Sequence, residues 1–194
     1  MNTHFMDMGL VHATCHPVYT LGPSGTSSES ASKYFCMRMK EFYSDSLNPI
    51  NLNETYEQAR DNTKQDNGLL VVANAYQKIN DFYMDSHLNL LATFVFDTPL
   101  YGIATNRSLP RRPLRIASHP APIPLIHELL PPGLQIETII EKNSTSEAAN
   151  AVTQQEADVA LTTEIAANLH NLSFISKVRP IHMLWSVFGC HPSK

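Results

Sequence analysis

LGPSGTSSES, residues 21–30, follows the short apolar run 18–21 and combines two glycines, a proline and five hydroxyl side chains, without lysine or arginine. Behind it, Ala31, Phe35 and Met39 recur at every fourth position, as residues on one face of a helix do. Glycine lets the backbone turn sharply and approach a ligand closely. The stretch therefore predicts a strand, a tight glycine turn and the start of a helix.

The helix start carries a capping signal, because Thr26 and Glu29 have the spacing of a capping box. Backbone N–H groups at such an end favour a small anion, such as a carboxylate or a phosphate. A nucleotide-binding P-loop needs a lysine here, and this loop has none. Two interpretations stay open for the loop by itself, a cradle for an anion or an ordinary capped turn.

The rest of the chain repeats the same plan of an apolar strand followed by a helical pattern. These segments are 69–76 with the helix after it, 90–104 interrupted by Pro99, 113–130, 135–152, 157–169 and a last strand at 183–189. Such alternation predicts an α/β fold with a mostly parallel sheet. Residues 1–16 resemble a loose arm. The basic, proline-bearing segment 107–113 is a natural lobe boundary, and it is either a solvated linker or a loop that steers an anionic substrate.

Composition excludes several functional classes. With 194 residues, 43% of them hydrophobic, the chain can bury a core, and its net charge is -4. It has no basic tract for nucleic acid, no apolar run of the ~20 residues that cross a membrane, and no signal peptide pattern. The three cysteines are an odd, widely spaced set, which favours reduced thiols and a cytoplasmic protein. The nine scattered histidines show no metal-ligand spacing. We expect no metal and no cofactor.

Helix starts with small polar residues recur along the chain, at 25–28, 118–120, 143–146 and 162–163. Ser144 and Glu147 have the spacing of a capping box, and Thr162 or Thr163 is the expected cap of the last of these helices. In open α/β sheets, ligands bind beyond the carboxyl ends of the strands. Several helix N-termini at one cleft suit a small polyanion without lysine or arginine. The residues by themselves therefore indicate a site for a small acid, and they do not indicate the reaction.

The ordered set LGPSGTSS, ASHPAP, NSTSEAA and DVALTTEIAA resembles the catalytic region of prephenate dehydratases over about residues 18–189. The resemblance implies two α/β lobes, periplasmic-binding-protein type II-like, with the active site in the cleft between them. Residues 18–100 with 181–189 would form one lobe and 103–180 the other. It leaves no chain for a regulatory amino-acid-binding domain or a chorismate mutase domain.

Two departures from that family stand out. The Thr-Arg-Phe triplet of dehydratases is matched by Ser186-Val187-Phe188, and their Pro-Ile-Glu-Asn-Ser by residues 71–75, so that Val187 and Ala73 replace charged residues. The segments VVANAY, FYMD, FDTPLYG, SHPAPI, ALTTEIA and MLWSVFG resemble a narrower group, the prephenate decarboxylases of bacilysin and aeruginosin-type natural-product pathways. This resemblance implies loss of carbon dioxide from prephenate with the ring hydroxyl retained, in a reaction that needs no cofactor.

The candidate site residues form two sets. Each residue also has an alternative, purely structural role in helix capping or core packing. The catalytic candidates are His119, Tyr76, Ser186 and Thr163. The substrate-binding candidates are Ser24, Gly25, Thr26, Ser28, Asn74, Ser118, Ser144, Thr145 and Trp185. His119 and Tyr76 are alternative proton donors, and Trp185 is either a wall against the substrate ring or a core residue.

Three functions compete. The first is the non-aromatising decarboxylase, the second a dehydratase that forms phenylpyruvate, and the third a non-catalytic binder of aromatic-pathway acids. Prephenate is the expected small-molecule partner, nucleic acid and membrane are excluded, and a homodimer remains an open alternative.

Overall fold

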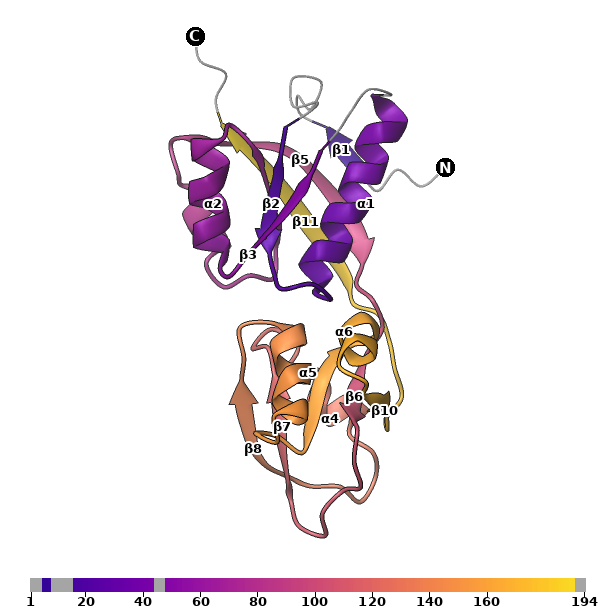
Figure 1. The fold of residues 1–194 in the computed structure, drawn as a ribbon. Coiled ribbons are helices and arrows are strands. Elements are labelled where there is room, and N and C mark those ends of the chain that lie inside the picture. Colours follow the sequence, from indigo (N-terminus) through magenta and orange to yellow (C-terminus); the bar gives the residue numbers. More distant parts are fainter. Residues whose placement is uncertain (1–4, 8–15, 44–47, 191–194) are drawn as a thin grey trace. The chain divides into compact units, whose positions relative to one another are not determined.

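The computed structural model describes residues 5–7, 16–43 and 48–190 (Figure 1). The chain divides into two compact units. The first comprises residues 1–22, 28–97 and 182–194, and the second comprises residues 23–27 and 98–181. The loop 23–27 therefore groups with the second unit, whereas the sequence placed it in the first lobe. Each unit is described by itself below.

The first unit is a six-stranded mixed sheet with helices on both faces. Its strands pair in the order β1-β5-β11-β4-β2-β3, of which β2 runs parallel to β3 and β4, while the other neighbours are antiparallel. Its elements are β1 (Phe5–Asp7), β2 (Val18–Leu21), α1 (Ser27–Phe42), β3 (Ile50–Asn53), α2 (Tyr56–Gln65), β4 (Leu69–Ala73), α3 (Ile79–Tyr83), β5 (Leu88–Asp97) and β11 (His182–Cys190).

Two cores lie on the two faces of this sheet. Helix α1 places the fully buried Ala31, Phe35 and Met39 against one face, as their spacing predicted. Helices α2 and α3 cover the other face through a cluster that includes Tyr56 and Phe82. Successive side chains of a strand point to opposite faces, so neighbouring residues of β4 and β11 belong to different cores.

The second unit is a five-stranded mixed sheet with strand order β10-β6-β9-β7-β8. Strand β7 runs parallel to β8 and β9, whereas β6 is antiparallel to β9 and β10. Its elements are β6 (Tyr101–Thr105), β7 (Leu114–Ser118), α4 (Leu125–Leu129), β8 (Ile136–Glu141), α5 (Thr145–Thr153), β9 (Val159–Thr163), α6 (Glu164–Leu169) and β10 (Ser173–Phe174). Helices α5 and α6 pack in an alanine-rich cluster, and α4 packs in a separate cluster rich in leucine and isoleucine.

The α/β class is confirmed, but the expectation of a mostly parallel sheet is wrong for both units. The chain leaves the first unit after Asp97 and re-enters it at His182, and these two residues lie opposite each other in the β5–β11 ladder. Strand β11 must therefore run back along β5, which makes the pair antiparallel. Residues 5–7, expected in a loose arm, form a strand against β5. Residues 1–4 and 8–15 of that arm, with Cys15, lie outside the described residues.

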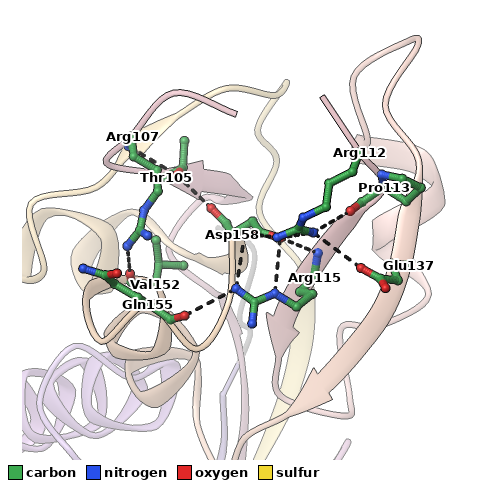
Figure 2. A network of polar contacts seen from close by, with 9 residues as sticks. All are labelled: Thr105, Arg107, Arg112, Pro113, Arg115, Glu137, Val152, Gln155 and Asp158. Carbon is green, nitrogen blue, oxygen red and sulfur yellow. Dashed lines mark hydrogen bonds and ion pairs between the residues drawn. The ribbon is translucent and has the colours of Figure 1, made fainter. Parts of the chain in front are cut away.

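The segment 107–113 is not a lobe boundary, because it connects β6 to β7 inside the second unit. Its arginines also hold it in place (Figure 2). Arg107 donates to the carbonyl of Val152 near the end of α5, and Arg112 donates two hydrogen bonds of 3.0 Å to the buried carboxylate of Asp158. Arg115 adds a hydrogen bond of 2.8 Å from its backbone N–H to the same carboxylate. The segment is an anchored, largely exposed loop of the second unit and not a linker between the lobes.

Asp158 is the centre of this network. Burial raises its pKa, but the hydrogen bonds from Arg115 and Arg112 outweigh burial, so that the pKa lies below its usual value. A carboxylate with a lowered folded-state pKa stabilises the fold above its unfolded-state pKa of about 3.9. That stabilisation is lost as the pH falls through the folded-state pKa.

We therefore expect Asp158→Asn to lower the free energy of unfolding at pH 7 by about 1–3 kcal/mol, because hydrogen bonds to a charged group are lost. The difference from the wild type should shrink as the pH falls toward the folded-state pKa. Urea denaturation followed by far-UV circular dichroism measures both quantities. Glu137→Gln is the matched control, because the exposed Glu137 contacts Arg112 at 3.4 Å, and it should change stability by less than about 0.5 kcal/mol. Equal effects of the two substitutions would contradict the assignment.

Candidate functional site

The candidate site residues fall into two groups, one in each unit. The first unit holds Ser28, Asn74, Tyr76, Trp185 and Ser186, and the second holds Ser24, Gly25, Thr26, Ser118, His119, Ser144, Thr145 and Thr163. Most members of both groups lie at or just beyond the carboxyl ends of parallel strands, where α/β folds place their ligands.

In the first unit, Asn74 and Ser186 meet at the end of β4. The Ser186 hydroxyl donates to Asn74 Oδ1 at 2.8 Å, and the backbone N–H of Asn74 donates to the carbonyl of Leu184 at 3.0 Å. A third residue, Tyr83 at the end of α3, closes the group. Its hydroxyl lies 2.8 Å from Ser186 Oγ and accepts a 3.2 Å hydrogen bond from Asn74 Nδ2. Asn74, Tyr83 and Ser186 thus form a closed hydrogen-bonded ring.

Tyr83 was missed by the sequence analysis. It lies one position after the buried Phe82 on a short helix, and nothing in its spacing indicates that it meets a strand residue more than a hundred positions further on. Its only local signal is its place in the FYMD segment, which is part of the resemblance to the decarboxylases but does not by itself assign Tyr83 to the site.

Ser28 lies in the first turn of α1, where its hydroxyl is 2.7 Å from the hydroxyl of Tyr56. The backbone N–H of Ala73 donates to the same Tyr56 oxygen at 3.3 Å. Tyr56 is buried, and its burial raises the pKa of its hydroxyl. Ser28 therefore contacts the end of β4 through Tyr56.

Tyr76 is a poor proton donor in this structure. Its hydroxyl donates to Glu57 Oε1 at 2.7 Å. Partial burial raises the pKa of Tyr76, and the neighbouring Glu57 carboxylate raises it further. A phenol whose proton is held by a carboxylate gives that proton to another group with difficulty.

Trp185 is a core residue. Its side chain is 1% exposed and packs among the residues under α1, and its indole N–H donates to the carbonyl of Phe96 at 3.3 Å. Val187, two positions later, belongs to the same core. Ser186 between them points to the opposite face. Of the two interpretations of Trp185, wall or core residue, the structure favours the core residue, since α1 covers its face of β11.

In the second unit, the loop 23–27 is held against the first turn of α6. Gly25 has φ of +90°, a conformation that favours glycine, and a Cβ there would lie 3.4 Å from Ala166 Cα. Thr163 Oγ1 donates to the carbonyl of Gly25 at 3.1 Å and accepts from the N–H of Ala166, capping α6. Thr26 is buried beside them and Ser24 is exposed.

Ser118 and His119 follow β7. The buried Ser118 hydroxyl donates to the carbonyl of His119 at 2.8 Å, and the N–H of Ala121 donates to His119 Nδ1 at 3.2 Å. The neutral ring then carries its proton on Nε2. Burial lowers the pKa of His119, and the nearby Glu141 carboxylate opposes this effect. His119 is thus a neutral imidazole at pH 7 that both orients its turn and keeps an Nε2 proton.

The start of α5 offers an unused donor. Ser144 caps the helix by accepting from the N–H of Glu147 at 3.0 Å, which confirms the predicted capping position. Thr145 follows, with a buried hydroxyl that has no hydrogen-bond partner among the described residues. A buried hydroxyl without a partner is unusual. Together with the first-turn N–H groups of α5, which have no carbonyl partner within the helix, it suits an anionic oxygen.

Both groups therefore present neutral donors. Hydroxyl, amide, imidazole and backbone N–H groups can orient carboxylates without a formal positive charge. Within the described ranges, no cluster of three His, Cys, Asp or Glu side chains suits a metal ion. No helix in the described part of the chain has the length and apolar character of a membrane span.

Comparison with solved structures defines the class. The chain superposes on a prephenate dehydratase from Arthrobacter aurescens, solved in complex with L-Phe, with a TM-score of 0.65 and 11% identity. The match covers 91% of this chain and 61% of the dehydratase chain, so this chain spans less than two thirds of its length. The fold is thus that of the prephenate dehydratase and periplasmic-binding-protein type II-like α/β proteins.

Comparison of sequences is more specific. A prephenate decarboxylase of Planktothrix agardhii is 36% identical over 180 residues, covering 88% of this chain and 86% of its own. A prephenate decarboxylase of Bacillus subtilis is 37% identical over 179 residues, covering 89% and 85%. No family model matches the chain. The chain belongs to the prephenate decarboxylase family.

The Thr163 hydroxyl makes two hydrogen bonds, one to Gly25 and one to the start of α6, and both should stabilise the second unit. Thr163→Val keeps the shape of the side chain but removes the cap of α6 and the bond to Gly25, so it should lower the free energy of unfolding by about 1–2 kcal/mol. Thr163→Ser keeps the hydroxyl and should retain most of that stability. Urea denaturation of the two variants makes the comparison, and a valine variant as stable as the serine variant would contradict the role of the hydroxyl.

Proposed function

We propose that this protein catalyses the non-aromatising decarboxylation of prephenate in natural-product biosynthesis of the bacilysin or aeruginosin type. The bond from the ring to its carboxylate breaks, carbon dioxide leaves, and the electron pair moves into the diene. A proton then adds to a ring carbon, and the ring hydroxyl stays. The product is a dihydro-4-hydroxyphenylpyruvate.

The observation that carries this proposal is the identity of 36% and 37% with proteins named prephenate decarboxylase, over nearly nine tenths of the chain. The neutral site supports it. Loss of hydroxide from the ring needs a proton donor or a positive field at the leaving oxygen. Retention of that hydroxyl is favoured where the surrounding donors are neutral.

In the second unit, we infer that Thr145, the first-turn N–H groups of α5 and the loop 23–27 orient a substrate carboxylate. His119 keeps an Nε2 proton and is the better of the two proposed proton donors, because the hydroxyl of Tyr76 is held by Glu57. A neutral imidazole donates a proton weakly, which suits a reaction that must leave the ring hydroxyl in place.

A cytoplasmic location belongs to the same proposal. Cys36 and Cys190 are free thiols. Burial raises the pKa of Cys36 to about 12 and also raises the pKa of Cys190. Both groups are therefore protonated at pH 7, which makes them unreactive and compatible with a reducing compartment.

The product of the reaction tests the proposed function. Purified protein incubated with prephenate should release carbon dioxide and form a product whose proton NMR spectrum retains the ring carbinol signal and shows non-aromatic ring protons. Phenylpyruvate as the main product would instead establish a dehydratase. Binding of prephenate without turnover would establish a non-catalytic binder.

Two glycines provide a matched test of the loop. Gly25 and Gly133 have φ of +90° and +86°, but a Cβ at Gly133 meets nothing within 4 Å. Alanine at either position should cost about 1–2 kcal/mol of stability, because both backbones are left-handed. Only Gly25→Ala places a methyl group against α6 at the proposed carboxylate site, so it should lower kcat/KM for prephenate by about tenfold or more (~1.4 kcal/mol per decade). Gly133→Ala should leave kcat/KM unchanged per folded molecule, and equal losses in both variants would contradict the role of the loop.

A further inference from the structure

The hydrogen-bonded ring of Asn74, Tyr83 and Ser186 uses nearly all the hydroxyl and amide protons of its three side chains. Ser186 has one hydroxyl proton, which it donates to Asn74 Oδ1 at 2.8 Å. The Tyr83 hydroxyl accepts from Asn74 Nδ2 at 3.2 Å, and its own proton is directed to Ser186 Oγ at 2.8 Å. Each hydroxyl then donates once and accepts once. One proton is left outside the ring, the second N–H of the Asn74 amide.

This result holds for both orientations of the amide. Exchange of the oxygen and nitrogen of Asn74 reverses all three hydrogen bonds, since Asn74 would then donate to Ser186, Ser186 to Tyr83 and Tyr83 to Asn74. The hydroxyl protons of Ser186 and Tyr83 remain inside the ring. The amide again keeps one N–H outside.

Burial agrees with this assignment. Ser186 is 0% exposed and lies on β11 beneath its two partners, whereas Asn74 is half-buried in the turn after β4 and Tyr83 is 38% exposed. A ligand can reach the amide of Asn74 without displacing either hydroxyl. It can reach Ser186 only if the ring opens.

Tyr83 is itself fixed by its surroundings. Its ring packs edge-on against Phe188, with centroids 5.0 Å apart, and it lies at the last residue of α3. Removal of its hydroxyl leaves that ring contact intact but frees the amide of Asn74 to rotate. A donor that must reorient during a reaction stabilises developing charge less than a donor already in place.

We propose that Tyr83 is a positioning residue, which closes this ring and so leaves the second amide N–H of Asn74, and not the hydroxyl of Ser186, as the donor to a negatively charged oxygen of the substrate. The proposal rests on the proposed function for the identity of the substrate. The preorganisation of Asn74 is a property of the first unit and can be measured without turnover.

A kinetic cycle tests the role in catalysis. Tyr83→Phe should lower kcat by about tenfold (~1.4 kcal/mol) and change KM by less than about threefold, because the lost interaction serves the transition state. In the Asn74→Ala background, Tyr83→Phe should change kcat by less than about twofold, because the group through which Tyr83 acts is already absent. An undiminished effect in that background would overturn the positioning role and make Tyr83 a direct donor.

Ser186→Ala tests the other candidate donor. It should lower kcat about as much as Tyr83→Phe does. A loss of kcat far larger than that of Asn74→Ala would assign the donor to Ser186.

Tyr34→Phe is the matched control. It removes a tyrosine hydroxyl from α1, where the ring stacks on Phe96 with centroids 4.8 Å apart, on the other face of the sheet. Its kcat should equal that of the wild type. An equal loss in the control would mean that the effect of Tyr83→Phe is not specific to the ring.

A second readout separates this proposal from the proposed function. The side-chain amide protons of Asn74, assigned by their absence in Asn74→Ala, should give a distinct pair of signals in a proton–nitrogen correlation spectrum. Tyr83→Phe should shift that pair and Tyr34→Phe should not, whatever product the wild type forms. Prephenate should then perturb the pair in the wild type. An unshifted pair in Tyr83→Phe overturns the proposal, whereas a shifted pair with phenylpyruvate as product overturns only the proposed function.

Discussion

The backbone pairing of β11 with β4 and β5 is the constraint on which the first unit depends. The strand lies inside the sheet, with Ser186 opposite both Val72 and Thr93. Because side chains alternate between faces, this ladder sends Trp185 and Val187 into the core under α1. It sends Ser186 and Phe188 to the face that α2 and α3 cover. One residue of slippage would exchange the two sets and break both the core and the hydrogen-bonded ring.

The alternation of side chains along β11 also accounts for one departure from the dehydratases, the valine at position 187. Val187 stands where their triplet has an arginine, and it is fully buried among apolar side chains. An arginine with that orientation would leave its charge without water or a partner, which is costly. The apolar residue is therefore required by the packing of this sheet. The hydrogen-bonded polar group of the first unit lies on the other face, in Ser186 and its partners.

Polar groups form two kinds of contact in this protein, charged pairs and neutral hydrogen bonds. Around Asp158, charge is concentrated and paired, and the result is an anchored loop. At the carboxyl ends of the strands, the polar groups are neutral and are held by one another, as in the contacts of Ser28 with Tyr56 and of Thr163 with Gly25. Neutral, mutually oriented donors can hold an anionic oxygen while adding little positive field around it.

By itself, the sequence determined the local elements of the protein. Periodicity found α1 with its buried face, capping residues found the starts of α5 and α6, and Pro99 marked the break between β5 and β6, since these features depend on neighbours within a few positions. Motif resemblance added the family. Only the tertiary structure decided that the sheets are mixed, that Trp185 is core, that Arg112 and Arg115 converge on Asp158, and that Tyr83 meets Asn74 and Ser186. Each of these depends on contacts between segments distant in the chain, for which local spacing carries no signal.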